Sequence, residues 1–431
     1  MGKGNSLVHC DRTDVGRKRS SNQDSLACLP PSSPAQYRHH GWLFLVADGM
    51  GAHAAGERAS GIAAERVPLL YTKAAGRSPP LALRRSLEMV NEEIHSSGES
   101  TPAYHGMGTT CTALAILPRG ALVGHVGDSR AYRIRGTTID QLTRDHSLVW
   151  EMESSMPAGQ SAAAGWPPKN IITRSMGPHS GVAVDVEGPF PVEEGDVYLL
   201  ASDGLTGQVA DEEIGLFTSQ LDPREAAEAL VGLTLVRGAP DNVTLIVLKA
   251  GPQEVSELHA DDEPWPMTEP DAPARTSGAV PWKPLVVAAA CLFASLAAWG
   301  QAQPMEWPPS DLMKTAAVAA AAMLFGAAIV SLLWAILQGM SPTESTPAVL
   351  APGARLGKGP YRSYSCAPDA ALIEGVVASI ESAAESLPPA RRPEAAERLA
   401  AARRQAAAGD PREALRSVKR AIDLHVQAIR S

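Results

Sequence analysis

The chain of 431 residues lacks several patterns, and each absence excludes a class of protein. Aromatic residues make up only 5% and the formal net charge is −9, whereas nucleic-acid binding normally needs a basic face. The five cysteines lie far apart with no C-x-x-C pair, which argues against a zinc site and against a disulfide framework. No long apolar segment follows Lys3, so a secretory signal peptide is not expected. We therefore expect reduced thiols and no nucleic-acid partner.

The length predicts more than one domain, since a domain typically has about 100–200 residues. Residues 6–250 alternate β-forming runs with amphipathic helical stretches at 56–75, 81–97 and 223–236, and can bury a substantial core. Residues 251–281 combine acidic residues with repeated prolines, which is typical of a solvated linker. The sequence thus predicts a folded α/β region followed by a linker.

Two uncharged apolar runs follow, at 284–305 and 315–340, and each exceeds the roughly 20 residues that cross a bilayer as a helix. The alternative is a pair of buried core helices. Tryptophans near the ends of the runs favour membrane insertion. Basic residues gather on the outer flanks of the pair, whereas the link at 306–314 is short and near neutral. We predict a two-helix transmembrane hairpin over 282–340 in the inner (cytoplasmic) membrane, with the α/β region and the C-terminal tail both cytoplasmic. The loop between the runs is too short for a ligand-sensing domain.

Beyond a second linker at 341–366, residues 367–431 are predicted to form a tail of three short helices. Apolar residues recur there at helical spacing. Gly409 is expected to end the middle helix, and Asp410 to cap the last one with Glu413 placed for a capping box. The last two helices resemble a single tetratricopeptide-type pair. Two readings stay open: a tail that binds a protein partner or anionic lipid, or a small solvated bundle.

Aspartates stand next to β-forming runs at four places, in Asp48-Gly49, Asp128-Ser129, Asp203-Gly204 and Asp241-Asn242. Carboxylates at strand ends can converge from distant parts of a sequence. Mg²⁺ and Mn²⁺ prefer oxygen ligands, few of them from protein and the rest from water. An isolated aspartate is more often a turn or cap residue, but four at such positions indicate a two-metal hydrolase that acts on phosphate esters.

Further motifs surround these aspartates along residues 6–250. In order they are Arg19-Ser20-Ser21-Asn22-Gln23-Asp24, Ala47-Asp48-Gly49-Met50-Gly51-Ala52-His53, Gly108-Thr109-Thr110, Val126-Gly127-Asp128-Ser129-Arg130, Thr143-Arg144-Asp145-His146-Ser147, Thr173-Arg174-Ser175-Met176-Gly177, Ala201-Ser202-Asp203-Gly204 and Pro240-Asp241-Asn242-Val243. As an ordered set they resemble the metal-dependent serine/threonine phosphatases of the PPM family, the PP2C-type enzymes, in their bacterial form. The resemblance implies an α+β, four-layer α-β-β-α sandwich, here followed by the two transmembrane helices and the helical tail.

The resemblance also assigns roles to individual residues. Asp48 would bridge two Mn²⁺ or Mg²⁺ ions, the Gly49 carbonyl would ligate one, and Asp203 and Asp241 would complete the ligands of the other. Asp24 would hold metal-bound water, and Asp128 with Asp203 would form a third, weaker metal site. Arg19 would bind the substrate phosphate, for which a guanidinium is suited. A hydroxide bridging the two ions would attack phosphorus, and Asn242 would orient Asp241 or a water.

The general acid is the least defined part of the predicted site. In one branch of the family a histidine directly follows the Asp-Gly pair, but Met50 stands there in this chain. His53 is the substitute that we assign, and metal-bound water is the alternative. Gln23 and Ala52 depart from the usual Glu and Gly of the family without deleting a ligand, and residues 152–169 correspond to the family's flap over the active site.

The sequence therefore predicts a membrane-tethered protein phosphatase acting on phosphoserine and phosphothreonine. Its expected partners are phosphorylated proteins near the membrane, including a Ser/Thr kinase and its targets. Two alternatives remain: an inactive phosphatase-like scaffold that recruits partners through its tail, which would predict a lost ligand, and a phosphatase for small metabolites. The sequence does not specify the substrate, the choice between Mn²⁺ and Mg²⁺, or the oligomeric state.

Overall fold

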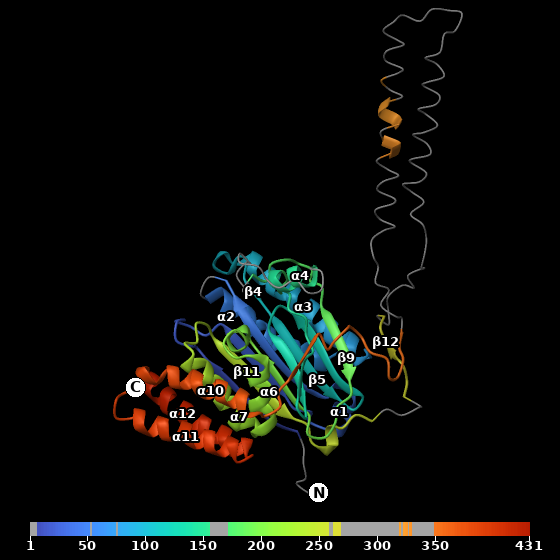
Figure 1. The fold of residues 1–431 in the computed structure, drawn as a ribbon. Coiled ribbons are helices and arrows are strands. Elements are labelled where there is room, and N and C mark those ends of the chain that lie inside the picture. Colours follow the sequence, from blue (N-terminus) through green and yellow to red (C-terminus); the bar gives the residue numbers. More distant parts are fainter. Residues whose placement is uncertain are drawn as a thin grey trace, which may run out of the picture. The chain divides into compact units, whose positions relative to one another are not determined.

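The computed structural model describes residues 7–51, 54–74, 76–155, 171–257, 262–268, 319, 322–325, 327–329 and 349–431. These residues divide into two compact units, one of residues 1–269 with 348–431 and the other of residues 270–347. The first unit contains two β-sheets packed face to face with helices outside them (Figure 1). This arrangement confirms the predicted sandwich of sheets and helices.

One sheet has the strand order β1-β11-β10-β7-β8-β14. Its strands are β1 (Val8–Asp14), β11 (Val243–Lys249), β10 (Val197–Ala201), β7 (Arg130–Arg135), β8 (Thr138–Gln141) and β14 (Arg362–Ser365). The other sheet has the order β2-β3-β5-β6-β9, and β4 (Gly108–Thr109) pairs with β3. Its strands are β2 (Asp24–Leu29), β3 (Trp42–Met50), β5 (Cys111–Leu117), β6 (Gly120–Val126) and β9 (Asp185–Phe190). All the pairings between these strands are antiparallel.

The central strands are apolar on both faces because both faces are covered. In β3, Phe44 and Val46 pack between the two sheets, whereas Leu43 and Leu45 face the helices α2 (Ala54–Thr72) and α3 (Pro79–Ser100). Successive strand side chains point to opposite faces, so one strand supplies two layers of core. On the other sheet, α6 (Asp211–Gln220) and α7 (Pro223–Val236) form the corresponding outer layer. The remaining helices of this region are α1 (Pro34–His40), α4 (Leu148–Ser155) and α5 (Asp203–Thr206).

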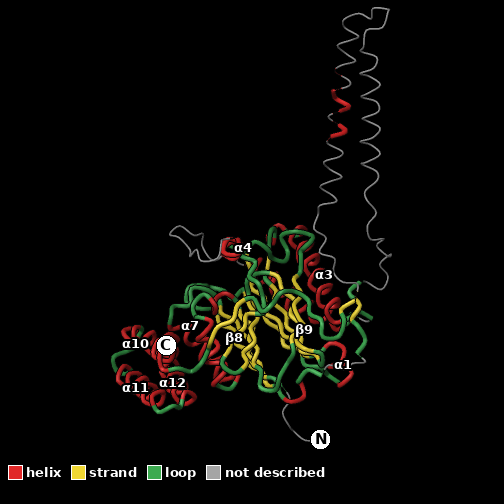
Figure 2. The backbone as a smooth tube through the Cα atoms, turned by 45° about the vertical axis from the view of Figure 1, so that its right-hand side comes forward, coloured by secondary structure: helices red, strands yellow, loops and turns green. Residues whose placement is uncertain are grey.

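The tail forms the three predicted helices, α10 (Ala370–Ser382), α11 (Arg392–Ala407) and α12 (Pro411–Arg430). Asp410 caps α12 by accepting a hydrogen bond from the Glu413 N–H at 3.1 Å, as the capping pattern predicts. The helices lie beside α7 in two views of the molecule (Figures 1 and 2). The buried side chains of α10 and α12 belong to the same apolar cluster as those of α6 and α7. The tail is therefore a further layer of the first unit and not a separate solvated bundle.

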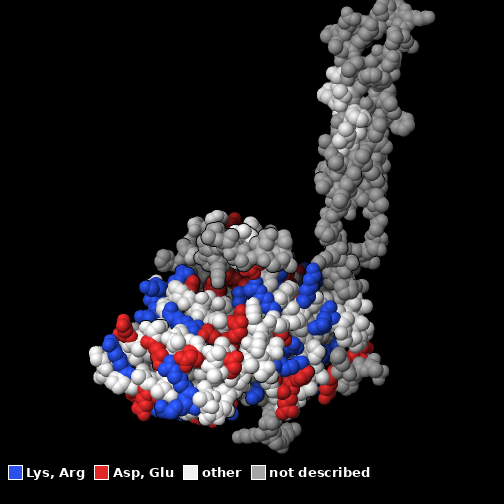
Figure 3. Space-filling model, in the orientation of Figure 1, with Lys and Arg blue, Asp and Glu red and all other residues white. Residues whose placement is uncertain are grey.

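Charged residues of α12 pair with the helix beneath it. Arg416 binds Glu225 at 3.1 Å, Lys419 binds Glu228 at 3.1 Å, and Arg412 binds Asp222 at 3.1 Å. On the face drawn in Figure 3, positive and negative side chains are interspersed over the tail and the sandwich. These basic residues thus have partners within the chain, and a protein or lipid partner for the tail stays a prediction.

The two segments predicted as linkers are partly packed against the sandwich, which corrects the expectation of solvated chain. After residue 250, the backbone of Ser256 bonds to Val192 and Glu257 bonds to Pro118. Arg119 stacks over Trp265 at 4.0 Å, and β12 (Trp265–Pro266) pairs with β13 (Val349–Leu350). Composition predicts solvation, but tertiary contacts to isolated apolar and aromatic residues outweigh it here.

The predicted transmembrane runs lie almost entirely outside the described residues. Eight residues of the second run are described, at 319, 322–325 and 327–329, and all are helical. Met323, Phe325 and Ile329 are 71%, 51% and 45% exposed there. Within the part of the chain that the structure describes, no helix is both long and apolar enough to span a membrane. The membrane hairpin therefore stays a prediction.

Docking of the tail can be tested at Ile422 of α12, which is fully buried against α7. A Cβ atom added to Gly232 of α7 would lie only 2.4 Å from Ile422, so the helices are in close contact. We expect Ile422→Ala to destabilise the full-length protein by about 2–4 kcal/mol, measured by thermal melting. The matched control, Val349→Ala at a residue 53% exposed, should change stability by less than about 0.5 kcal/mol. Equal melting temperatures for both variants would contradict the docked tail.

Candidate active site

The five aspartates predicted for the metal site lie at one end of the sandwich because of how the antiparallel strands are paired. In the β2–β3 pair, Asp24 is the direct partner of Asp48. Asp128 follows β6, Asp203 begins α5 just after β10, and Asp241 precedes β11. Since β10 pairs antiparallel with both β7 and β11, the last residue of β10 lies beside the start of each neighbour. The pairing therefore brings side chains more than 200 residues apart to the same edge.

Burial and mutual repulsion raise the pKa values of these carboxylates. Burial raises the pKa of Asp48 well above the ordinary value of an aspartate, and repulsion from Asp24, Asp203, Asp128 and Asp241 raises it further. Burial, followed by the charge of Asp203, raises the pKa of Asp128 to about 8. Burial also raises the pKa of Asp24 to about 6, although hydrogen bonds from Thr244 and Ser202 oppose this rise. The site is thus an acidic cluster short of positive charge.

The hydrogen bonding of the cluster is incomplete. Asp24 accepts a bond from Ser202 on one oxygen at 2.8 Å, but its other oxygen has no partner. One buried oxygen of Asp128 and one of Asp203 are also without a partner. A buried acceptor normally finds a donor, so three orphan carboxylate oxygens in one cluster call for a cation. All-oxygen donors of this kind suit Mg²⁺ or Mn²⁺. The residues present therefore fit the metal ions that the sequence predicts.

Two threonines hold the backbone around Asp48. Both belong to the Gly108-Thr109-Thr110 motif, but the sequence assigns them no role. The hydroxyl of Thr110 accepts a bond from the Asp48 N–H at 2.9 Å, and the hydroxyl of Thr109 donates to the Asp48 carbonyl at 3.0 Å. Gly49 packs so tightly that a Cβ atom there would lie 2.1 Å from the carbonyl oxygen of Gly56. Only glycine fits this position, which leaves the Gly49 backbone close to the cluster.

Arg19 lies at the edge of the cluster, where its Nη2 donates to Asp241 at 2.7 Å. Its side chain is 50% exposed, so the guanidinium is accessible from solvent. Asn242 holds the loop that carries Arg19: its side-chain amide donates to the carbonyls of Val15 and Ser21, and its side-chain oxygen accepts from Gln23. The sequence predicts instead that Asn242 orients Asp241 or a water. The contact with Asp241 comes only from the Asn242 backbone N–H, at 2.9 Å.

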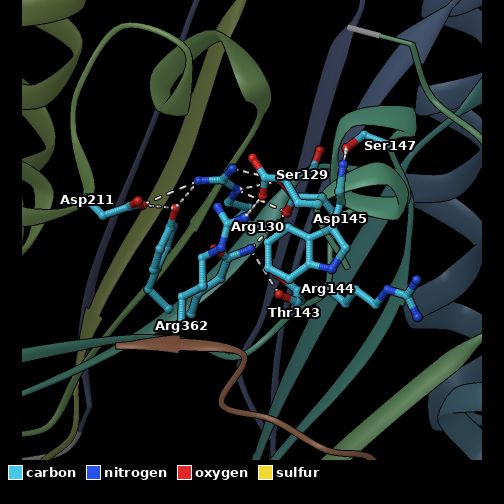
Figure 4. Close-up of polar contacts among 12 residues, drawn as sticks. Ser129, Arg130, Thr143, Arg144, Asp145, Ser147, Asp211 and Arg362 are labelled. Atoms are coloured by element: carbon cyan, nitrogen blue, oxygen red, sulfur yellow. Dashed lines mark hydrogen bonds and ion pairs between the residues drawn. The ribbon is translucent and has the colours of Figure 1, made fainter. Parts of the chain in front are cut away.

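A second network begins two residues after Asp128 in the chain and is centred on Arg130 (Figure 4). Arg130 donates to both oxygens of Asp145 at 2.7–3.0 Å and also reaches Tyr132 and Asp211. Gln141 donates to Asp145 as well, at 2.8 Å. Arg130 lowers the pKa of Asp128, although less than burial raises it. This buried network was not recognised in the sequence because its members lie on β7, β8, α6 and the loop that carries Asp145.

The remaining predicted residues have different outcomes. His53 lies outside the described residues, so its role as general acid stays a prediction. The flap predicted at 152–169 overlaps α4 at its start, and residues 156–170 are outside the described part of the chain. His146 is buried, and its ring nitrogens bond to the Gly127 backbone and to Asp185 at 3.0 Å each. These two bonds give His146 a structural role.

A separate cluster lies near the other ends of β1 and β2. His9, Asp11 and Cys28 have ligand atoms within 4.8 Å of one another, although the cysteine spacing argues against a zinc site. The ring of His9 also packs edge-on against Phe44, at 5.3 Å between centroids. This packing gives His9 a structural role without a metal.

A cavity of about 490 Å³ opens beside the acidic cluster. Asp128, Asp203 and Asp241 line it, together with Trp150 and Glu153 of α4. Arg362 of β14 also lines it. The cavity is large enough for a phosphorylated side chain, and its wall combines the carboxylate cluster with groups from α4 and β14.

Comparison with known proteins identifies the family of this chain. Residues 15–231 match the family described as Protein phosphatase 2C. The chain is 35% identical over 246 residues to the protein phosphatase PhpP of Streptococcus pneumoniae, covering 56% of this chain and 97% of PhpP. It is 32% identical to the serine/threonine phosphatase stp of Listeria monocytogenes over 247 residues, covering 55% and 94%. A crystal structure of the Mycobacterium tuberculosis serine/threonine phosphatase PstP/Ppp matches with 31% identity and a TM-score of 0.49, covering 57% and 98%. The chain therefore belongs to the protein phosphatase 2C family and is a serine/threonine protein phosphatase.

Proposed function

We propose that this phosphatase uses two or three Mn²⁺ or Mg²⁺ ions and acts from the membrane on phosphoserine and phosphothreonine of nearby proteins. The observation that carries the metal dependence is the convergence of five aspartates with three orphan buried oxygens. Asp48, Asp203, Asp241 and the Gly49 carbonyl would hold two ions, and Asp24 would hold coordinated water. Asp128 with Asp203 would hold a third ion. When bound, the ions would neutralise charge on the phosphoryl group and lower the pKa of a coordinated water.

The chain's own residues would position the phosphate. Arg19 donates to Asp241 through a single nitrogen, so its other donors can bind phosphoryl oxygens in parallel. Asn242 fixes the ends of the loop around Arg19, which restricts where that guanidinium can reach. We assign the proton transfer to the leaving oxygen to His53, with a coordinated water as the alternative.

Membrane tethering is supported by the two long apolar runs and by the exposed apolar side chains Met323 and Phe325 on described helical residues. Pairing of β12 with β13 brings together the two segments that lead into and out of residues 270–347. Tethering would raise the effective concentration of membrane-proximal phosphoproteins, including a Ser/Thr kinase and its targets, without any new contact.

The metal proposal predicts the effect of Asp203→Asn on phosphate release from a phosphothreonine peptide. The amide removes one anionic ligand, so we expect kcat/KM of the full-length protein with Mn²⁺ to fall about a hundredfold or more. EDTA should abolish turnover of the unmodified protein. As a matched control, Asp222→Asn on the surface of the catalytic unit should leave turnover unchanged. Turnover that persists in EDTA would refute the proposal.

The raised pKa values of the cluster predict how the metal-free protein responds to pH. Native Asp24 and Asp128, with pKa values of about 6 and about 8, bind more protons than the same residues in the unfolded chain. The free energy of unfolding should therefore fall as the pH rises from about 4 to about 8.

Calorimetry in EDTA should show this decline as a falling melting temperature, and Mn²⁺ should raise the melting temperature more at pH 8 than at pH 5. Asp128→Asn removes one buried charge, so it should raise the metal-free melting temperature at pH 8 and reduce the response to Mn²⁺. A melting temperature that is independent of Mn²⁺ at both pH values would contradict the assignment.

The membrane hairpin predicts the fractionation behaviour of a deletion variant. The full-length protein should remain with membranes after alkaline carbonate extraction. Replacing residues 282–340 by a short flexible linker should move the protein to the soluble fraction with its phosphatase activity retained, because β12 and β13 still pair. Full-length protein in the carbonate supernatant would overturn the hairpin.

A further inference from the structure

Arg362 reaches the active-site cavity from a segment outside the region that matches the family. The match covers residues 15–231, whereas β14 begins at residue 362. Arg362 nevertheless lines the same cavity as Asp128, Asp203 and Asp241. Its side chain extends from β14 toward Arg130 (Figure 4). The substrate surface of this chain therefore includes a residue that the family domain alone does not supply.

The backbone on both sides of Arg362 is firmly held. Arg362 is the register partner of Gln141 in β8, and the Tyr361 N–H donates to the Gln141 carbonyl at 2.8 Å. Ser363 donates to Asp140 at 2.6 Å. Cys366, at the end of the segment, is fully buried. These contacts fix where the Arg362 side chain leaves the sheet.

The guanidinium of Arg362 lies over an aromatic ring and keeps most of its donors. Its central carbon lies 3.9 Å from the centroid of Trp150 in α4. One nitrogen pairs with Glu153, also in α4. No other hydrogen bond of this guanidinium is formed with the residues that the structure describes, although an arginine has five N–H donors. Stacking on an aromatic ring leaves the guanidinium edge available for an anion.

The charges of the cavity wall decide which ligand this site prefers. The other lining arginine, Arg130, is buried and bound by Asp145, Tyr132 and Asp211, so it has little capacity for a ligand. Arg362 is 30% exposed and its partner Glu153 is 43% exposed. An ion pair as exposed as this one contributes only about 0–1 kcal/mol, so an incoming anion can displace Glu153 into solvent.

We propose that Arg362, stacked on Trp150, forms an anion subsite that binds an acidic group next to the phosphorylated residue of the substrate. The acidic group is a carboxylate or a second phosphate, either of which can accept two parallel hydrogen bonds from the guanidinium. The subsite confers a preference for acidic or multiply phosphorylated peptides. The proposal rests on the phosphatase function of the neighbouring cluster.

The test compares three phosphothreonine peptides that differ only beside the phosphorylated residue, which is flanked by alanine, by aspartate or by phosphoserine. Full-length protein in detergent micelles with Mn²⁺ is used, because β14 and the tail are part of the catalytic unit. In Arg362→Gln, kcat/KM for the two acidic peptides should fall about tenfold through KM, with the alanine peptide unchanged. The aspartate and phosphoserine arms distinguish the two kinds of anion.

Two further variants isolate the subsite. Trp150→Leu should also lower kcat/KM for the acidic peptides, since it removes the ring over which the guanidinium lies. Arg355→Gln, at an exposed arginine of the same segment, should have no effect. If Arg362→Gln lowers kcat/KM equally for all three peptides, the role of Arg362 is merely structural. If kcat/KM does not change for any peptide, the guanidinium does not contact the substrate. Either result overturns the proposal.

A binding measurement separates failure of the subsite from failure of the metal mechanism. Fluorescence anisotropy with labelled peptides in EDTA requires no turnover. The unmodified protein should bind the acidic peptides more tightly than the alanine peptide, and Arg362→Gln should remove this difference. Equal affinities in the unmodified protein would refute the subsite even if the enzyme is active.

Discussion

Mutual repulsion among carboxylates at one end of the sandwich is the constraint on which this structure depends. Asp24 and Asp48 face each other across β2 and β3, and Asp128, Asp203 and Asp241 raise the pKa of Asp48 further. Such a cluster persists because the buried central strands of the two sheets fix the strand registers, and no single side chain can move away without disturbing the core between the sheets. The repulsion that disfavours the metal-free protein is what would favour divalent cations.

The catalytic unit of this chain is larger than the region it shares with its relatives. The helices α10 and α12 bury apolar side chains against α6 and α7, and β14 extends one sheet beyond β8. The strand β14 and the tail helices follow residues 270–347 in the sequence and pack on the sandwich. The catalytic unit is therefore formed from two separated parts of the sequence. Arg362 therefore adds to the wall of the active-site cavity. Its position there depends on the packing of residues 348–431 against the sandwich.

Sequence patterns predicted the local elements well. The helix at Pro223–Val236 and the capping of α12 by Asp410 follow from short-range signals. The packing of the two linkers could not be predicted from the sequence, because proline and acidic residues indicate solvation. The contacts that hold these linkers, such as Arg119 over Trp265, join residues about 150 positions apart. The role of Asn242 was also missed, since its amide bonds to backbone groups more than 200 residues away.

By itself, the sequence determined the residue types of the acidic cluster and their placement beside strands, since strand-forming runs and turn residues are local signals. It also identified the family, because the motifs occur in a fixed order. Only the tertiary structure decided which carboxylates lie opposite one another, which oxygens remain without donors, and that Arg362 belongs to the cavity wall. Those properties arise from strand register and from packing between distant segments, and neither leaves a periodic trace in the sequence.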